Sequence, residues 1–249
     1  MQNHSWNLDL PQRTRKKREK GITSISDKGL GLNALADIID ICGDFIDICK
    51  FSIGSAVVTG KLKEKIAIYK RNNIDVYFGG SIFEKFYSQG KLDDYKKALD
   101  FFGVEIVEIS DGTVDISVQD KAKIIKDFCN YYKVIAEVGC KDREVVFSPD
   151  EWVFQLQECL RSGASMLICE GRESADAGIY NDDGTPREDS IENIVKYIPL
   201  ERIIWEAPKA KNQIYYINRF GADVNLGNIA PHEVLILESQ RVGLRYDTF

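Results

Sequence analysis

Short apolar segments alternate with longer segments of helical period along nearly the whole chain, and this alternation constrains the fold more than any other feature. Eight segments have the length and the Ile, Val and Phe content of strands: 22–26, 45–51, 74–78, 105–110, 134–138, 166–169, 202–205 and 222–226. Most of them are continuously apolar, as parallel strands are when both faces are covered. The pattern predicts a repeating β/α protein.

The signals between these segments predict helices that start and stop where such a fold requires. Ser148 followed by proline, with Glu151 three residues after the serine, is typical of a capped helix start. Glycines that stand just before a strand predict helix ends: Gly43, Gly103, Gly163 and Gly221. Eight βα units without a linker favour one domain, a closed (β/α)₈ TIM barrel over 21–249, after a short basic N-terminal extension over 1–20.

Charge and composition exclude several classes of function. The chain of 249 residues has 39 acidic and 33 basic side chains and a net charge of −6, which disfavours binding to nucleic acid or to acidic membranes. It has no apolar run near the ~18–20 residues of a membrane span and no signal-peptide pattern, so we expect a cytoplasmic protein with reduced cysteines. Only two histidines and no C-x-x-C pair disfavour catalytic triads and zinc sites. Catalysis would depend on carboxylates, Lys, Arg, backbone amides or a hard metal ion.

The basic run over 13–20, Arg-Thr-Arg-Lys-Lys-Arg-Glu-Lys, lies within the extension. A solvated arm, a contact between copies of the chain, or a lid that supplies cations to an anionic substrate would each explain it. The sequence leaves these alternatives open.

Charged residues gather at the predicted carboxyl ends of the strands, where barrels of this class have their active sites. Four consecutive strands carry a glutamate at a similar height: Glu108, Glu137, Glu170 and Glu206. Unpaired buried carboxylates are unfavourable, so we expect these four to meet at one mouth together with cations. The expected cations are Mg²⁺, Lys28, Lys50, Lys141 and Arg172. The alternative is a set of Glu–Lys and Glu–Arg pairs that only brace the barrel.

Motifs at the same strand ends run in order from about Leu10 to the C-terminus. They are Asp27-Lys28-Gly29, Lys50-Phe51, Gly79-Gly80-Ser81-Ile82-Phe83-Glu84, Glu108-Ile109-Ser110-Asp111-Gly112, Glu137-Val138-Gly139 with Lys141, Glu170-Gly171-Arg172-Glu173-Ser174, Glu206-Ala207-Pro208, Asn225 with Asn228, and Gly243-Leu244-Arg245. In these motifs the sequence resembles the phosphosulfolactate synthase family.

The resemblance implies a Mg²⁺-dependent carbon–sulfur lyase that adds sulfite to phosphoenolpyruvate, giving (2R)-phospho-3-sulfolactate for coenzyme M biosynthesis. It implies that Lys141 is the general acid that protonates the carbon bearing the phosphate. Lys50 and Glu137 complete the expected catalytic set, and the expected metal ligands are Glu108, Glu170 and Glu206. The expected substrate-binding residues are Lys28, Arg172, Lys209, Asn225, Asn228 and Arg245. We also expect a homo-oligomer.

The chain departs from the family pattern beside the expected site. Lys50-Phe51-Ser52-Ile53-Gly54-Ser55 stands where the family commonly has K-F-G-W-G-T, and Cys140 stands where some members have a further lysine. These changes bear on the nucleophile more than on the type of reaction. Two alternatives therefore stay open, namely a related enolate-forming barrel enzyme with another nucleophile or acceptor, and a non-catalytic barrel that binds or protects.

Overall fold

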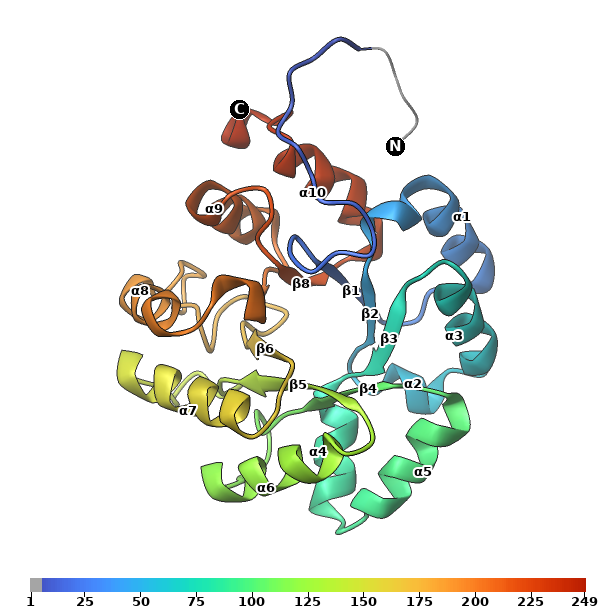
Figure 1. The fold of residues 1–249 in the computed structure, drawn as a ribbon, viewed down its shortest axis with the longest axis vertical. Coiled ribbons are helices and arrows are strands. Elements are labelled where there is room, and N and C mark those ends of the chain that lie inside the picture. Colours follow the sequence, from blue (N-terminus) through green and yellow to red (C-terminus); the bar gives the residue numbers. More distant parts are fainter. Residues whose placement is uncertain (1–5) are drawn as a thin grey trace.

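The computed structural model describes residues 6–249, which form one eight-stranded parallel sheet with helices around it (Figure 1). The strands are β1 (Thr23–Asp27), β2 (Ile48–Phe51), β3 (Asp75–Phe78), β4 (Ile106–Ile109), β5 (Lys133–Val138), β6 (Met166–Cys169), β7 (Ile203–Glu206) and β8 (Leu226–Ile229). Their order is β3-β2-β1-β8-β7-β6-β5-β4, and β4 also packs beside β3. The ring confirms the predicted (β/α)₈ TIM barrel.

The helices lie outside the strands as a ring, as Figure 1 shows. They are α1 (Leu32–Cys42), α2 (Ser55–Val58), α3 (Leu62–Arg71), α4 (Gly80–Ser88), α5 (Leu92–Phe102), α6 (Val118–Phe128), α7 (Pro149–Arg161), α8 (Glu188–Tyr197), α9 (Ala210–Phe220) and α10 (Val234–Arg241). Ser148 and Glu151 form the predicted capping box of α7. No helix within residues 6–249 is long and apolar enough to cross a bilayer.

The barrel interior has an apolar layer beneath a charged one. The apolar layer consists of Ile22, Ile48, Tyr77, Ile106, Ile135, Met166, Ile168 and Ile204. Two residues after an isoleucine of this layer stands a charged residue, within four of the strands or, for Glu170, directly after β6: Lys50, Glu108, Glu137, Glu170 and Glu206. Alternate residues of a strand face the same side, so these five side chains point into the barrel above the apolar floor. The charged layer therefore faces the carboxyl ends of the strands.

The basic run of the extension packs against the opposite end of the barrel. The buried Arg13 pairs with Asp223, which comes before β8. Arg18 Nη1 lies 2.9 Å from Oδ1 of Asp47, the residue that precedes β2. Of the three alternatives for this run, a lid over an anionic substrate does not fit these two arginines, because they bind at the amino ends of the strands.

The last strand begins four residues later than the segment 222–226 predicts. Asn225 consequently precedes β8, and its Oδ1 accepts the backbone N–H of Ile22 at 2.9 Å. The assignment of Asn225 to substrate binding is wrong, because its side chain joins the amino ends of neighbouring strands. Gly227 and Asn228 are residue types typical of turns, so the predicted strand ended before them, but both lie inside β8.

Candidate functional site

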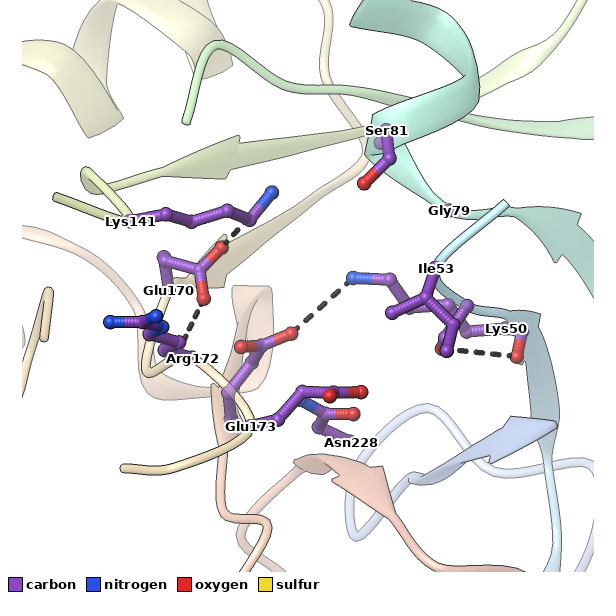
Figure 2. Close-up of a pocket in the computed structure, with 12 residues that line it drawn as sticks. Lys50, Ile53, Gly79, Ser81, Lys141, Glu170, Arg172, Glu173 and Asn228 are labelled. Atoms are coloured by element: carbon purple, nitrogen blue, oxygen red, sulfur yellow. Dashed lines mark hydrogen bonds and ion pairs between the residues drawn. The ribbon is translucent and has the colours of Figure 1, made fainter. Parts of the chain in front are cut away.

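A charged cavity of about 210 Å³ lies at the carboxyl ends of the strands. Its wall is formed by Lys50, Ser52, Ile53, Gly79, Gly80, Ser81, Lys141, Glu170, Arg172, Glu173, Glu206 and Asn228. In Figure 2 Lys50 and Lys141 enter from opposite sides and point toward the same space. The predicted convergence of the strand ends on one hollow is therefore confirmed.

Lys50 is the centre of one group of carboxylates. Its Nζ lies 2.9 Å from Glu108 Oε2, 3.1 Å from Glu137 Oε2 and 3.3 Å from Glu206 Oε1. Burial opposes a charge on this lysine, but the three carboxylates outweigh burial and hold the pKa of Lys50 well above its usual value. Lys50 is therefore an ammonium ion at neutral pH.

Lys141, from the loop after β5, is the centre of a second group. Its Nζ lies 3.4 Å from Glu137 Oε1, 3.5 Å from Glu170 Oε2 and 3.8 Å from Glu84 Oε1. Burial lowers the pKa of Lys141, but these carboxylates raise it above the ordinary value by a larger amount. The side chain carries the proton that a general acid must hold before it reacts.

The glutamates differ in how well their charges are balanced. Burial acts against ionisation of Glu137, but the ammonium groups on either side hold its pKa well below the usual value. Burial raises the pKa of Glu108 to about 8. Burial, with the nearby carboxylates of Glu137 and Glu206, also raises the pKa of Glu170 well above its ordinary value. The buried Oε2 of Glu170 accepts no hydrogen bond and has only the more distant Lys141 ammonium, at 3.5 Å, beside it, so this position of the pocket suits an added cation.

The carboxylates do not form a metal cage of three protein ligands. Within residues 6–249 no three His, Cys, Asp or Glu side chains are arranged to hold one metal ion. Glu108 lies below the cavity wall, where it accepts the backbone N–H of Gly80 at 2.5 Å and pairs with Lys50. Glu170 and Glu206 do line the wall. These two fit a Mg²⁺ site in which waters and substrate oxygens supply the other ligands, which is the usual arrangement for this ion.

Three of the predicted substrate-binding residues lie at or beside the cavity. Arg172 and Asn228 line it, and both have a left-handed backbone, with φ of 56° and 59°. Lys28 lies at the rim, with its Nζ 2.5 Å from Oε1 of the wall residue Glu173. These residues bring cationic and amide groups to the mouth.

Two other predicted substrate ligands do not line the cavity. Lys209 is exposed at the start of α9 and does not line the cavity. Arg245 follows α10, whose last residue, Arg241, donates to the backbone oxygen of Val224 at 2.7 Å, before β8 begins. The assignment of Arg245 to the site is wrong, because α10 carries the chain back to the amino ends of the strands.

Ser110 and Glu84 belong to the site but were not among the predicted functional residues. Ser110 Oγ lies 2.6 Å from Glu84 Oε1 and 2.9 Å from Glu137 Oε1. Ser110 stands two residues after Glu108, so the alternation of a strand places it on the same inner face. Glu84 lies on α4, in the motif that follows β3, but nothing in the sequence assigns it a role, because its contact with Ser110 depends on the packing of the helix.

Ile53 has an unfavourable backbone at the mouth of the cavity. Its φ is 48° and its side chain is 62% exposed, while Ser52 and Ser55 beside it are buried. A left-handed backbone costs a β-branched residue roughly 1–3 kcal/mol. We expect Ile53→Asn to raise Tm, by about 2–4 °C for each kcal/mol regained, because asparagine tolerates this conformation. Calorimetry should show no such gain for Val57→Asn on α2, and a lower Tm for Ile53→Asn would contradict the strain.

Comparison with known proteins identifies the family. The model of the (2R)-phospho-3-sulfolactate synthase (ComA) family matches residues 11–247. The chain is 39% identical over 251 residues to the phosphosulfolactate synthase of Methanothermobacter thermautotrophicus, covering 98% of this chain and 97% of that protein. It is also 39% identical to the phosphosulfolactate synthase of Bacillus subtilis, covering 99% of each.

Among solved structures, the 3-hexulose-6-phosphate synthase of Salmonella typhimurium has a TM-score of 0.53 at 16% identity, covering 88% of this chain and 99% of that one. That likeness shows the barrel fold alone. The sequence matches extend over almost the whole length of this chain and of both relatives. The chain therefore belongs to the phosphosulfolactate synthase family of enzymes.

Proposed function

We propose that the protein adds sulfite to phosphoenolpyruvate and produces (2R)-phospho-3-sulfolactate, as a lyase that forms a carbon–sulfur bond. Membership in the family supports the reaction. The observation that carries the proposal is the pair of ammonium groups, Lys50 and Lys141, which face one cavity above an apolar floor. Such a cavity can bind a small anion and deliver a proton to it.

The charges in the wall support a requirement for a divalent cation. Glu170 and Glu206 line the same cavity as the lysines, and Glu170 has a buried oxygen without a hydrogen-bond partner. Two anionic substrates bound in this cavity would be repelled by carboxylates in its wall whose charge is not compensated. We infer that Glu170 and Glu206 hold Mg²⁺, which when bound supplies Lewis-acid stabilisation of negative charge on the substrate.

The protein's own residues would bind the substrates and move one proton. The sulfur of sulfite forms a bond to the methylene carbon, and the electron pair of the double bond moves toward the carboxylate. Lys141 then donates a proton from Nζ to the carbon that bears the phosphate, and the lysine becomes a neutral amine. The reaction is an addition, and no group leaves the substrate. Lys50 stays charged, because three carboxylates hold its proton, and attracts the substrate anion. Arg172 at the wall suits phosphate or sulfite oxygens.

Purified protein mixed with phosphoenolpyruvate, sulfite and Mg²⁺ is expected to form a new phosphorus species in ³¹P NMR. Chelation of Mg²⁺ should stop its formation. Independently of turnover, Mg²⁺ should raise Tm of the wild type and raise it less in Glu170→Gln, which keeps the side-chain shape but removes the charge. Glu173→Gln, on the same loop, is the matched control for that shift. Absence of sulfite-dependent consumption of phosphoenolpyruvate would overturn the proposal.

The second candidate is a related enolate-forming enzyme with another nucleophile or acceptor. The observation that favours it is the pair Ser52 and Ile53 in the cavity wall, at the positions where the sequence departs from its family. Consumption of phosphoenolpyruvate with another nucleophile, and none with sulfite, would support this candidate.

A further inference from the structure

The helix α4 carries a buried carboxylate next to the proposed proton donor. Glu84 is almost completely buried, and its Oε1 lies 2.6 Å from Ser110 Oγ and 3.8 Å from Lys141 Nζ. Glu84 does not line the cavity, so it does not reach the substrate directly. It contacts the groups that determine where the Lys141 ammonium lies.

The start of α4 fits so closely against β4 that the place of Glu84 is fixed. Gly80, the first residue of α4, donates its backbone N–H to Glu108 Oε1 at 2.5 Å. A Cβ atom at Gly80 would overlap Ser110 Cβ, so only glycine permits this approach. Residues four apart lie on the same face of a helix. The contact at Gly80 therefore directs Glu84 toward Ser110 as well.

Ser110 and Lys141 together link two buried carboxylates. The serine hydroxyl has one hydrogen but lies within hydrogen-bond distance of both Glu84 Oε1 and Glu137 Oε1. Each of these carboxylates also lies near Lys141 Nζ, at 3.8 Å and 3.4 Å. Apolar residues of similar volume often replace buried ion pairs without loss of stability. Stability alone therefore gives no reason for a carboxylate on α4.

We propose that Glu84 is a positioning residue which, with Ser110 and Glu137, holds the Lys141 ammonium at the cavity. The Lys141 side chain is 31% exposed, and its flexible stem lies over Gly112, where a Cβ would come within 3.2–3.4 Å of it. Ion pairs at its tip therefore restrict where its ammonium can lie. This inference rests on the proposed function, in which Lys141 gives its proton to the substrate.

Glu84→Gln tests the inference, because glutamine keeps an acceptor for Ser110 but has no charge for Lys141. We expect kcat to fall about 10- to 100-fold, since small misplacements of a catalytic group have effects of that size, while KM changes less than about 3-fold. A crystal structure should show Lys141 Nζ displaced from its wild-type position, away from residue 84. Glu84→Asp, which restores the charge on a shorter side chain, should recover part of kcat.

Glu238→Gln is the matched control. Glu238 is also a buried glutamate on a helix, paired with Arg13 at the other end of the barrel, and its loss should lower Tm while kcat is unchanged. If Glu84→Gln does not fold, Ser110→Ala removes only the link and should also lower kcat and displace Lys141.

Unchanged kcat with Lys141 in its original place would overturn the inference. If the wild type does not consume phosphoenolpyruvate, the proposed function fails. The position of Lys141 in the Glu84→Gln crystal structure then decides the inference by itself: a displaced ammonium supports it, and an unmoved one overturns it.

Discussion

Replacement of Lys141 by alanine is expected to lower kcat by about 10²- to 10⁴-fold, which is the usual contribution of a positioned general acid. Three carboxylates keep the Lys141 amine protonated before the reaction. Alanine has no proton to give, and water in the cavity is a poorer donor at the same place. Initial rates from ³¹P NMR, with phosphoenolpyruvate and sulfite both saturating, measure the change.

The Lys141→Ala protein should remain folded, although the loss of an ammonium beside three buried carboxylates lowers its melting temperature. The lysine is 31% exposed, so water from the cavity can enter its space, and the loss of stability should be smaller than for the more deeply buried Lys50. Lys123→Ala on α6 is the control, because Lys123 is exposed and its partner, Asp120, is an exposed carboxylate. A folded Lys141→Ala protein with the wild-type rate would reject the role of general acid.

The barrel itself was predictable, because apolar strands and helical segments alternate with a regular period. The predicted strand over 166–169 is exact, and most of the others differ from the structure by one or two residues. The predicted segment 45–51 is shorter in the structure, because Gly43–Phe45 forms a 3₁₀ turn before β2. In β8 turn-forming residue types occupy a strand, since sheet pairing with β1 and β7 outweighs local preference.

The charged residues of the site were largely predictable from the sequence, but the ion pairs and hydrogen bonds among them were not. The glutamates at equal heights on successive strands do meet, as the two-residue alternation requires. Their spacing along the chain does not reveal that Lys50 occupies the space among three of them. It also does not reveal the contact of Glu84 with Ser110, because a helix brings Glu84 across from its own βα unit. Such contacts depend on packing between elements, which is not a property of either segment alone.

Replacement of the buried Lys50 by methionine is expected to lower the free energy of unfolding at pH 7 by about 3–5 kcal/mol, the usual loss when one partner of a buried ion pair is removed. Methionine fills a similar volume, so the loss comes mainly from three carboxylates that no longer have their ammonium. Urea unfolding followed by circular dichroism measures it. Lys65→Met is the comparison, because it leaves one buried carboxylate, that of Asp27, without its ammonium instead of three, so its loss of unfolding free energy should be smaller.

The free energy of unfolding that Lys50→Met loses should be larger at high pH than at low pH. In the wild type the depressed pKa of Glu137 contributes stability above the pKa of an unfolded carboxyl group, about 4.3, and this stability is lost as the pH falls. Without Lys50, burial raises the pKa values of the carboxylates instead. The free-energy cost of keeping these buried carboxylates ionised in the folded state is then absent below about pH 4.3 and grows as the pH rises above it. The difference in free energy of unfolding between wild type and variant should therefore become smaller as the pH is lowered from 8 to 5.

A second substitution distinguishes charge from packing as the cause. Burial already raises the pKa of Glu108 to about 8 in the wild type, so this carboxylate is the least favourable one to leave without an ammonium. Lys50→Met/Glu108→Gln should recover part of the stability lost in Lys50→Met, and most of that recovery should appear at the higher pH. An equal loss at pH 5 and pH 8, with no recovery in the double variant, would mean that Lys50 stabilises the barrel through packing alone.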